Sequence, residues 1–342
     1  MRVLHITYRA GHGLGGAAEA VVRIHREMSG RGVDSRIVTA ESGGGLFRVC
    51  TGLLRNFFRL TPIGRRVTLN VMPLPGLDRA VDEFDPDEVW VHWIGLDTCS
   101  LRQLERIAKK RRLVLRMHDF QFFCGLGMFP NEKPAGRFAA FLDRWLVGRK
   151  MRIVRAAARI EAPSAWAAGE VRRLSGAGAD KVQVVTNPIE AAFVREGGRR
   201  PRPTGSRVVL FGCHGGRANP YKGWEDLVRA IGTMTDGEKQ TVVLWVFGEA
   251  AEPCLTAGVR TEFFGAVDST DALAQIYRSA DVLAFPSKME TGPMVVREAM
   301  ACGLKVVAFN RAACAEAIED GVTGRVVEPG DYRGFAEALL CA

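Results

Sequence analysis

Short apolar runs rich in β-branched residues alternate with helical patterns along this chain, and the alternation breaks once before it resumes. Residues 3–7 and 113–117 are such runs, and residues 17–31 have helical spacing. Strands that alternate with helices form a parallel, doubly wound sheet, so an α/β protein is expected. The further expected strands are residues 36–40, 88–92, 160–162, 208–212, 242–248, 261–264, 282–286, 305–309 and 324–327, and the further expected helices are residues 98–110 and 164–175.

A polar, proline-containing stretch at residues 195–206 separates the two series of patterns. With 342 residues, of which 47% are apolar, the chain is long enough to bury two cores. We therefore expect two domains, residues 1–195 and 206–342, each built on a doubly wound sheet. Domains of this kind bind ligands at the carboxyl ends of their strands.

The eight cysteines form no C-x-x-C pair and no cluster with histidine at zinc spacing, which is typical of reduced thiols in a cytosolic protein. The N-terminal run Met-Arg-Val-Leu-His-Ile-Thr is too short for a signal peptide and predicts a first strand. No segment approaches the ~20 apolar residues that cross a bilayer. These features favour a cytoplasmic protein, at most peripheral on the inner membrane.

Arginine accumulates in one segment of this basic chain, whose net charge is +9. Between residues 46 and 79, six arginines and a single acid are interleaved with apolar residues at about helical spacing. The pattern fits a helix on an anionic membrane surface, and equally a core helix with a solvated basic face. Nucleic acid is not expected as a partner, because the chain lacks a recognition helix, an aromatic RNA-binding motif and a zinc finger. The arginines are Arg48, Arg55, Arg59, Arg65, Arg66 and Arg79.

Two glutamates eight residues apart, Glu290 and Glu298, flank a Gly-Pro pair directly after an expected strand. Pro293 suits the first turn of a helix, because its missing N–H costs nothing there, and Gly303 would end that helix. Glu290 then lies in the loop and Glu298 about one turn inside the helix. Unpaired N–H groups and the dipole at such a helix start attract a diphosphate.

This segment resembles the donor-site signature of family 4 of the glycosyltransferases, which have the GT-B fold of two Rossmann-like domains. The similarity extends from residue 1 to about residue 335, and its specific parts are the two glutamates and Lys222-Gly223. It implies that Glu290 binds hydroxyls of the donor sugar and that Glu298 binds those of the ribose. The resemblance places the donor at the helix start as well, at Gly292, Pro293, Met294 and Val295.

A glycine-rich turn after the expected strand at residues 208–212 carries two cations, Arg217 and Lys222, just before a helix. Fixed cations beside backbone amides can neutralise a diphosphate leaving group without a metal. The resemblance assigns this role to Arg217 and Lys222, although an inserted Gly-Gly-Arg-Ala-Asn-Pro stretch lengthens the turn. A solvated basic turn is the alternative.

The loop Gly11-His-Gly-Leu-Gly-Gly16 follows the first strand and fits the pattern G-x-G-x-x-G. Glu41 lies after the second strand, roughly where a dinucleotide site keeps its ribose-binding acid. An NAD-type dehydrogenase is therefore an alternative function. In the family that the chain resembles, Gly15 and Gly16 would instead let the backbone approach the donor phosphates and the acceptor.

His118 and Asp119 directly follow the expected strand at residues 113–117 and resemble the His-Asp pair of the family, whose histidine reaches the donor sugar. His92 ends another strand and is, with Asp119, a candidate on the acceptor side. Histidines that only satisfy buried hydrogen bonds are the alternative for both rings. Asp85-Pro-Asp87 has the spacing of a metal-binding D-x-D, but it precedes a strand as a proline turn, and a structural role is expected.

Together these features imply a hexosyltransferase-type enzyme, retaining and independent of metal or other cofactors, that moves a sugar from a nucleoside-diphosphate sugar to a hydroxyl. The basic segment suggests a glycan or lipid-linked acceptor in bacterial polysaccharide biosynthesis. A nucleotide-sugar epimerase and a non-catalytic nucleotide-binding regulator are further alternatives. Residue 342 falls where family members usually add a helix that crosses back to the first domain.

Overall fold

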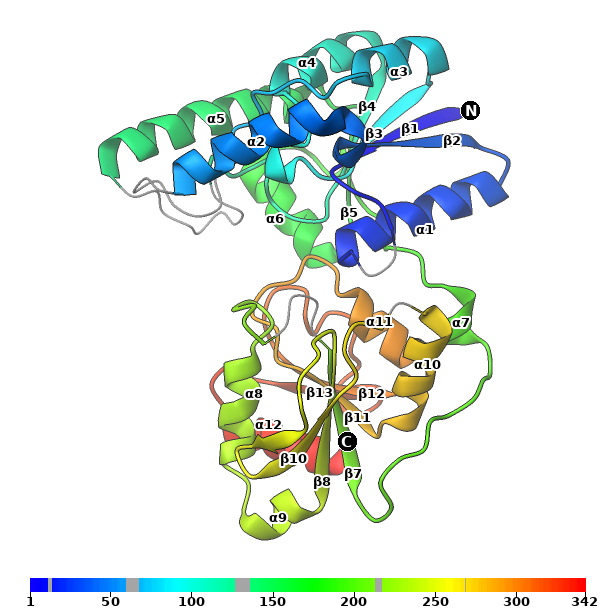
Figure 1. The fold of residues 1–342 in the computed structure, drawn as a ribbon, viewed down its shortest axis with the longest axis vertical. Coiled ribbons are helices and arrows are strands. Elements are labelled where there is room, and N and C mark those ends of the chain that lie inside the picture. Colours follow the sequence, from blue (N-terminus) through cyan, green and yellow to red (C-terminus); the bar gives the residue numbers. More distant parts are fainter. Residues whose placement is uncertain (12–13, 60–67, 127–135, 213–216, 268) are drawn as a thin grey trace. The chain divides into compact units, whose positions relative to one another are not determined.

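The computed structural model describes the chain except for residues 12–13, 60–67, 127–135, 213–216 and 268, and gives only the backbone of residues 54–59. The chain divides into two compact units, Met1–Pro188 and Ile189–Ala342. Each unit is a mainly parallel sheet with helices on both faces (Figure 1), which confirms the α/β class expected from the alternating patterns.

In the first unit, the described residues form a six-stranded parallel sheet of order β2-β1-β3-β4-β5-β6. The chain adds β2 on one side of β1 and β3 on the other. This reversal is the switch point at which the loops of a doubly wound sheet diverge and ligands bind. The strands are β1 (Arg2–Thr7), β2 (Asp34–Thr39), β3 (Glu88–Val91), β4 (Arg112–Arg116), β5 (Arg159–Ala162) and β6 (Val182–Val184).

Helices cover both faces of this first sheet. α4 begins at a capping box, in which the Ser100 hydroxyl accepts the backbone N–H of Gln103 and the Gln103 side chain accepts that of Ser100. The helices are α1 (Gly16–Gly30), α2 (Gly44–Arg59), α3 (Leu77–Phe84), α4 (Leu101–Lys110), α5 (Gly136–Ala156) and α6 (Ala165–Ser175), with short 3-10 turns η1 (Ala40–Gly43) and η2 (Gly95–Asp97).

In the second unit, the described residues form a seven-stranded sheet of order β13-β12-β11-β7-β8-β10-β9, in which β9 is antiparallel to β10. Its switch point lies between β7 and β11. The strands are β7 (Arg207–Gly212), β8 (Val242–Phe247), β9 (Cys254–Thr256), β10 (Val259–Phe263), β11 (Val282–Phe285), β12 (Lys305–Phe309) and β13 (Gly324–Val327). The helices are α7 (Ala191–Val194), α8 (Trp224–Gly232), α9 (Asp236–Gln240), α10 (Thr270–Ser279), α11 (Met294–Ala301) and α12 (Tyr332–Cys341).

Alternate side chains of β7 enter two separate cores, as expected for a sheet buried on both faces. Val209 and Phe211 pack in the core that α8 and α12 cover. Val208 and Leu210 pack in the core that α10 and α11 cover. Burial on both faces explains why these strands are near-continuous apolar runs in the sequence.

The boundary between the units falls at Pro188–Ile189, ahead of the polar segment at residues 195–206 that the sequence indicates as a linker. Phe193 of α7 is 1% exposed and packs against Tyr277 in the core of the second unit. Farther along, Arg202 forms an ion pair with Asp281 over 2.6 Å. These contacts attach the polar segment to the second unit.

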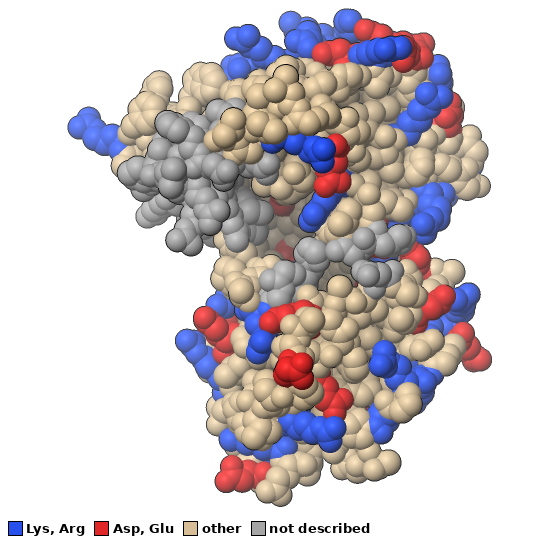
Figure 2. Space-filling model, in the orientation of Figure 1, with Lys and Arg blue, Asp and Glu red and all other residues tan. Residues whose placement is uncertain are grey.

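The basic segment at residues 46–79 is not one helix, because α2 ends at Arg59 and α3 begins at Leu77. Arg65 and Arg66 lie outside the described residues, which are grey in Figure 2, so the structure says nothing about their part in a membrane surface. Among the helices that are described, none is long and apolar enough to span a bilayer.

Candidate active site

The loops that follow β7 and β11 diverge from the sheet at the switch point of the second unit, and they contact each other directly. The backbone N–H of Lys288 donates to the carbonyl of Tyr221 over 2.7 Å. Gly223 has a φ of 74°, and a Cβ at this position would lie 2.1 Å from the carbonyl oxygen of Pro286. Both the left-handed backbone and the close approach therefore require glycine after Lys222.

Lys222 and Glu290 form an ion pair across this contact, although they are 68 residues apart in sequence. The distance from Lys222 Nζ to Glu290 Oε1 is 2.7 Å, and the two side chains are 26% and 16% exposed. An ammonium group has three N–H donors, so Lys222 can keep Glu290 and still donate to a phosphate oxygen. The structure thus brings together the groups predicted to bind the diphosphate and the sugar.

Arg217 is held by Glu249, which follows β8. Glu249 accepts the backbone N–H of Arg217 over 2.7 Å and the side-chain Nε and Nη2 over 3.1 and 2.9 Å. The guanidinium also lies over the rings of Trp224 and Phe263, 5.5 and 4.8 Å from their centroids. The hydrogen bonds raise the pKa of Arg217 and lower that of Glu249. Arg217 is therefore a fixed cation whose N–H donors would be divided between Glu249 and a phosphate.

The helix start predicted for donor binding is α11. Pro293 is the residue before its first turn, with φ −70° and ψ 105°, and not within the turn as expected, because its backbone is still extended. Gly292 precedes it, and Met294 and Val295 open the helix, whose first N–H groups have no acceptor within the helix. Gly303, with a φ of 79°, follows the helix end as predicted.

Glu298 lies one turn inside α11, as predicted, and is 4% exposed. The hydroxyl of Tyr277 on α10 donates to its Oε2 over 3.3 Å. A buried carboxylate needs hydrogen bonds to offset its lost hydration, and Tyr277 provides one of them. Tyr277 therefore orients the carboxylate predicted to bind the ribose.

In the first unit, His92 directly follows β3, and His118 lies two residues after the end of the neighbouring β4. Nδ1 of His92 is 3.1 Å from Nε2 of His118, and the two rings stack at 18° with centroids 5.3 Å apart. Burial lowers the pKa of His118 to about 3, and the Arg116 cation adds to the effect. The pKa of His92 is also held well below its usual value by burial. Both rings are therefore neutral near pH 7.

Asp119 lies beside His118 and accepts hydrogen bonds from the indole N–H of Trp93 and, over 3.0 Å, from the backbone N–H of Gln121. Burial raises the pKa of Asp119 to about 6. The buried ammonium of Lys150 on α5 donates to two carbonyls farther along the same loop, that of Cys124 over 2.7 Å among them. The loop after β4 is thus anchored by Trp93 at Asp119 and by Lys150 at Cys124 and Gly125.

Gly15 and Gly16 occupy the amino end of α1. Gly15 is the N-cap with a φ of 102°, and Gly16 is the first helical residue. Gly13 of the G-x-G-x-x-G pattern lies outside the described residues. Glu41 lies in η1, where its backbone N–H donates to the carbonyl of Tyr8 over 3.2 Å.

The D-x-D of residues 85–87 lies at the amino end of β3, the edge of the sheet opposite to His92. The Asp85 carboxylate pairs with Arg111, and Asp87 accepts the backbone N–H of Arg2 over 2.7 Å. Both aspartates of the motif thus contact other parts of the first unit. Within the described ranges, no group of three or more His, Cys, Asp or Glu side chains is arranged to hold a metal ion.

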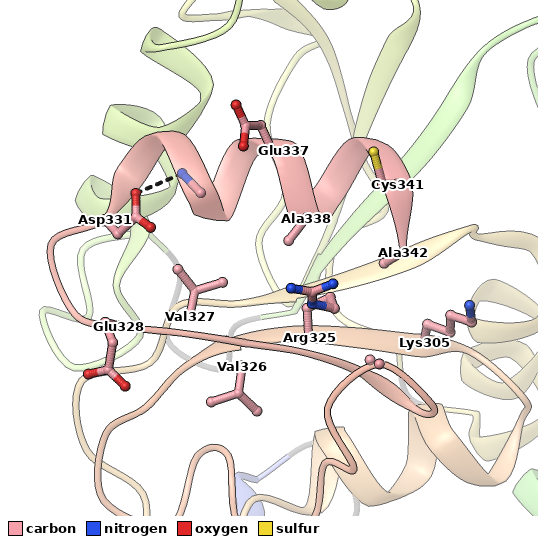
Figure 3. Close-up of a pocket in the computed structure, with 13 residues that line it drawn as sticks. Lys305, Arg325, Val326, Val327, Glu328, Asp331, Glu337, Ala338, Cys341 and Ala342 are labelled. Carbon is pink, nitrogen blue, oxygen red and sulfur yellow. Dashed lines mark hydrogen bonds between the residues drawn. The ribbon is translucent and has the colours of Figure 1, made fainter.

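A pocket of about 480 Å³ lies between β12, β13 and α12 (Figure 3). Its described lining residues, which include Arg325, Asp331 and Glu337, contain none of the predicted site residues. β13 is the edge strand of its sheet. The charged pairs and diverging loops described above lie instead at the switch point between β7 and β11.

Sequence reasoning missed several partners of the predicted residues, among them Glu249, Trp93 and Tyr277. Glu249 follows a strand in a Gly-Glu pair, and its position at the carboxyl end of β8 was a signal that could have identified it. Trp93 directly follows His92 and could have been found in the same way. Tyr277 lies inside α10, and nothing in its local pattern distinguishes it from a core aromatic residue.

The model of the domain described as Glycosyltransferase Family 4 matches residues 14–193, and that described as Glycosyl transferases group 1 matches residues 208–342. The chain belongs to glycosyltransferase family 4. The first match begins within the glycine loop, so membership favours the glycosyltransferase interpretation of Gly15 and Gly16 over the dehydrogenase.

Known relatives of this family 4 chain include the glycogen synthase of Mycobacterium tuberculosis, 30% identical over 58% of this chain and 47% of the relative. The D-inositol 3-phosphate glycosyltransferase 1 of Catenulispora acidiphila is 27% identical over 96% of this chain and 82% of the relative. The chain thus spans about half the length of the first of these curated relatives.

Solved structures confirm the GT-B fold. The sucrose-phosphate synthase of Thermosynechococcus elongatus aligns with 99% of this chain and 89% of its own, with a TM-score of 0.70 and 16% identity. HepE of Anabaena, solved in complex with UDP, covers the same shares with a TM-score of 0.65 and 19% identity. At these identities the likeness establishes the fold.

Proposed function

We propose that this protein is a retaining, metal-independent glycosyltransferase that transfers a hexose-type sugar from a nucleoside-diphosphate sugar to a hydroxyl acceptor. The observation that carries the proposal is the Lys222–Glu290 pair, 2.7 Å long, at the switch point of the second unit. It joins a cation suited to a diphosphate and a carboxylate suited to sugar hydroxyls beside the start of α11.

In the proposed reaction the bond between the anomeric carbon and the diphosphate oxygen breaks, and its electron pair leaves with the diphosphate. Lys222, Arg217 and the N–H groups that open α11 stabilise the charge that develops there. The acceptor oxygen bonds to the face that the diphosphate leaves, and its proton passes to a phosphate oxygen. Glu290 binds the sugar hydroxyls and Glu298 the ribose hydroxyls.

His118 and Asp119 act on the sugar and the acceptor in this proposal. Because His118 is neutral near pH 7, it orients the sugar by hydrogen bonding and does not supply a positive charge. Asp119, whose pKa is raised to about 6, remains mainly ionised at neutral pH and can accept a hydrogen bond from a hydroxyl.

A lipid-linked acceptor at an anionic membrane surface is the part of the proposal that rests on exposed apolar side chains. On α2, Leu46, Val49 and Leu53 are 79%, 57% and 64% exposed at helical spacing. We propose that these side chains enter the headgroup region of the bilayer.

A second apolar row lies on α5, a helix that the sequence did not predict. Phe138, Phe141 and Trp145 are 69%, 61% and 45% exposed and follow one another at helical spacing. Arg137 and Arg144 beside them are exposed as well. Basic side chains near an anionic surface each add about 1 kcal/mol to binding, and buried aromatic rings add more.

Replacing both Phe138 and Phe141 with serine should lower sedimentation with anionic liposomes at least about tenfold, because two exposed rings no longer enter the bilayer. Leu255 of β9, 72% exposed in the other unit, gives the matched control Leu255→Ser, which should bind as the wild type does. A wild type that does not sediment with these liposomes at low salt would remove the membrane part of the proposal.

The donor part is tested by thermal unfolding of the wild type with a panel of nucleoside-diphosphate sugars and, separately, NAD and NADP. At 100 times its dissociation constant, a true donor should stabilise the folded protein by about 2.7 kcal/mol and raise Tm by several degrees. A rise with NAD or NADP and none with any nucleotide sugar would instead support the dehydrogenase.

A further inference from the structure

Four histidines and a serine form a continuous hydrogen-bonded chain in the first unit. His118 Nε2 lies 3.1 Å from His92 Nδ1, and His92 Nε2 lies 2.8 Å from His5 Nδ1. His5 Nε2 lies 3.0 Å from Ser35 Oγ, which is 2.8 Å from His25 Nδ1. The members come from β2, β1, the ends of β3 and β4, and α1, so the chain runs across four neighbouring strands.

The chain continues an apolar cluster on the same face of the sheet. Val3, Trp90 and Val114 pack with Ile24 of α1. His5 is two residues beyond Val3, and strand alternation places both on one face. The same spacing relates His92 to Trp90, while His118 stands four residues beyond Val114. This face of the sheet therefore has apolar side chains in the middle of the strands and linked imidazoles near their carboxyl ends.

Each ring inside the chain uses both of its nitrogens, and this restricts its protonation. A neutral imidazole has one N–H donor and one acceptor nitrogen, and the bond at one nitrogen decides the state of the other. From His118 to Ser35, the hydrogens must therefore all point towards Ser35 or all point towards His118, while the Ser35 hydroxyl has two lone pairs and can accept from both of its neighbouring rings. A reversed ring at His92 would place two hydrogens, or two lone pairs, in one contact.

Burial keeps the histidine rings of the hydrogen-bonded chain neutral. It lowers the pKa of His5 to about 3, as it does for His118, and His92 is shifted in the same direction. The Arg116 cation on β4 lowers the pKa of His92 and His118 further, and burial also lowers the pKa of His25 on α1. A protonated ring within the chain is thus disfavoured, which argues for orientation rather than proton storage.

We infer that His5 and His92 are positioning residues, which hold the His118 ring in one tautomer and one orientation through a hydrogen-bonded chain that ends at Ser35 and His25. The hydrogen-bonded chain links His118, just beyond β4, to α1, which begins at Gly16 after the N-cap Gly15. Its consequence for turnover rests on the function proposed above, whereas the state of the His118 ring does not.

The test records ring 15N NMR spectra of ligand-free protein labelled at histidine, for the wild type and two variants of one position. In the wild type, His118 should be neutral and in a single tautomer at pH 7.5. His92→Leu removes the hydrogen bonds from His92 to His118 and to His5, and it should change the tautomer populations of His118. His92→Asn places an amide near the former Nδ1, so it should restore the single tautomer of His118.

The kcat measured with the donor should fall in the variant that changes the His118 tautomer and recover in the variant that restores it. We expect kcat of His92→Leu to fall at least about tenfold while the KM for donor changes less than about twofold, and His92→Asn to recover part of the loss. A purely structural role predicts the reverse order, since leucine is the better residue in an apolar core. The control is Val91→Ala, which shortens a buried side chain on the opposite face of β3 and should leave the His118 tautomer unchanged.

Ser35→Ala provides a second break in the chain, at a half-buried position where misfolding is not expected. It should shift the tautomer populations at His5 and, through the chain, at His118. A charged His118 in the wild type, or a single unchanged His118 tautomer in both His92→Leu and Ser35→Ala, would overturn the inference. If the wild type proves to transfer no sugar, the spectra still decide whether the chain holds the ring.

Discussion

Lys222→Ala should lower kcat/KM for the donor about 100-fold, which corresponds to about 2.7 kcal/mol of transition-state stabilisation. The ammonium group lies at the contact of the loops after β7 and β11, where the diphosphate is proposed to leave. Because Lys222 lies in a loop and its side chain is 26% exposed, Tm should change by less than about 2 °C. Steady-state kinetics with the donor identified by thermal unfolding would measure the effect.

Lys288 is the matched control for this variant, since it lies in the facing loop and is 39% exposed with its Nζ 4.0 Å from Glu225. Lys288→Ala removes the same charge from the same surface and should keep turnover within about twofold of the wild type. Equal losses in the two variants would mean that only the general basic character of the loop matters. Wild-type turnover in Lys222→Ala would contradict the proposed role of Lys222.

Replacing Glu298 is expected to separate donor binding from folding. Glu298→Gln keeps an acceptor for the Tyr277 hydroxyl but loses the charge, so donor affinity should fall about tenfold with little change in Tm. Glu298→Ala also leaves the buried hydroxyl of Tyr277 without this acceptor, so it should additionally lose about 1–3 kcal/mol of unfolding free energy. Titration calorimetry and thermal unfolding give the two quantities separately.

Tyr277→Phe is the control for that pair of variants, because it removes the hydroxyl and leaves the carboxylate in place. Tyr277→Phe should lower the unfolding free energy, as Glu298→Ala does, while its donor affinity should fall less than that of Glu298→Gln. If Glu298→Gln binds the donor as tightly as the wild type, Glu298 is a structural partner of Tyr277 and does not contact the ribose.

Much of the fold could be predicted from the sequence, because strands buried on both faces are continuous apolar runs. The runs at Val282–Phe285 and Lys305–Phe309 are examples. The missed strands β6 and β9 have three residues each and lie at sheet edges, where little apolar burial marks them. α5 was missed because Phe138 and Phe141 are apolar on its exposed side, which blurs the helical period.

The site was predictable residue by residue but not as a set of contacts. Motif spacing singled out Lys222 and Glu290, yet no local pattern reveals that loops 68 residues apart bring them within 2.7 Å. The partner of Arg217 is likewise set by the order of β7 and β8 in the sheet. His92 and His118 were recognised at strand ends, whereas His5 looks like any residue within an apolar strand and gains its meaning only from its neighbours.

The central claim is metal-independent transfer with retained anomeric configuration. The direct measurement is proton NMR of the product formed from a nucleoside-diphosphate α-sugar and a hydroxyl acceptor in excess EDTA. We predict turnover and an α-linked product, since Lys222, Arg217 and the start of α11 supply the charge compensation that a divalent ion would otherwise provide. A β-linked product, or activity that EDTA abolishes and Mg²⁺ or Mn²⁺ restores, would contradict this account.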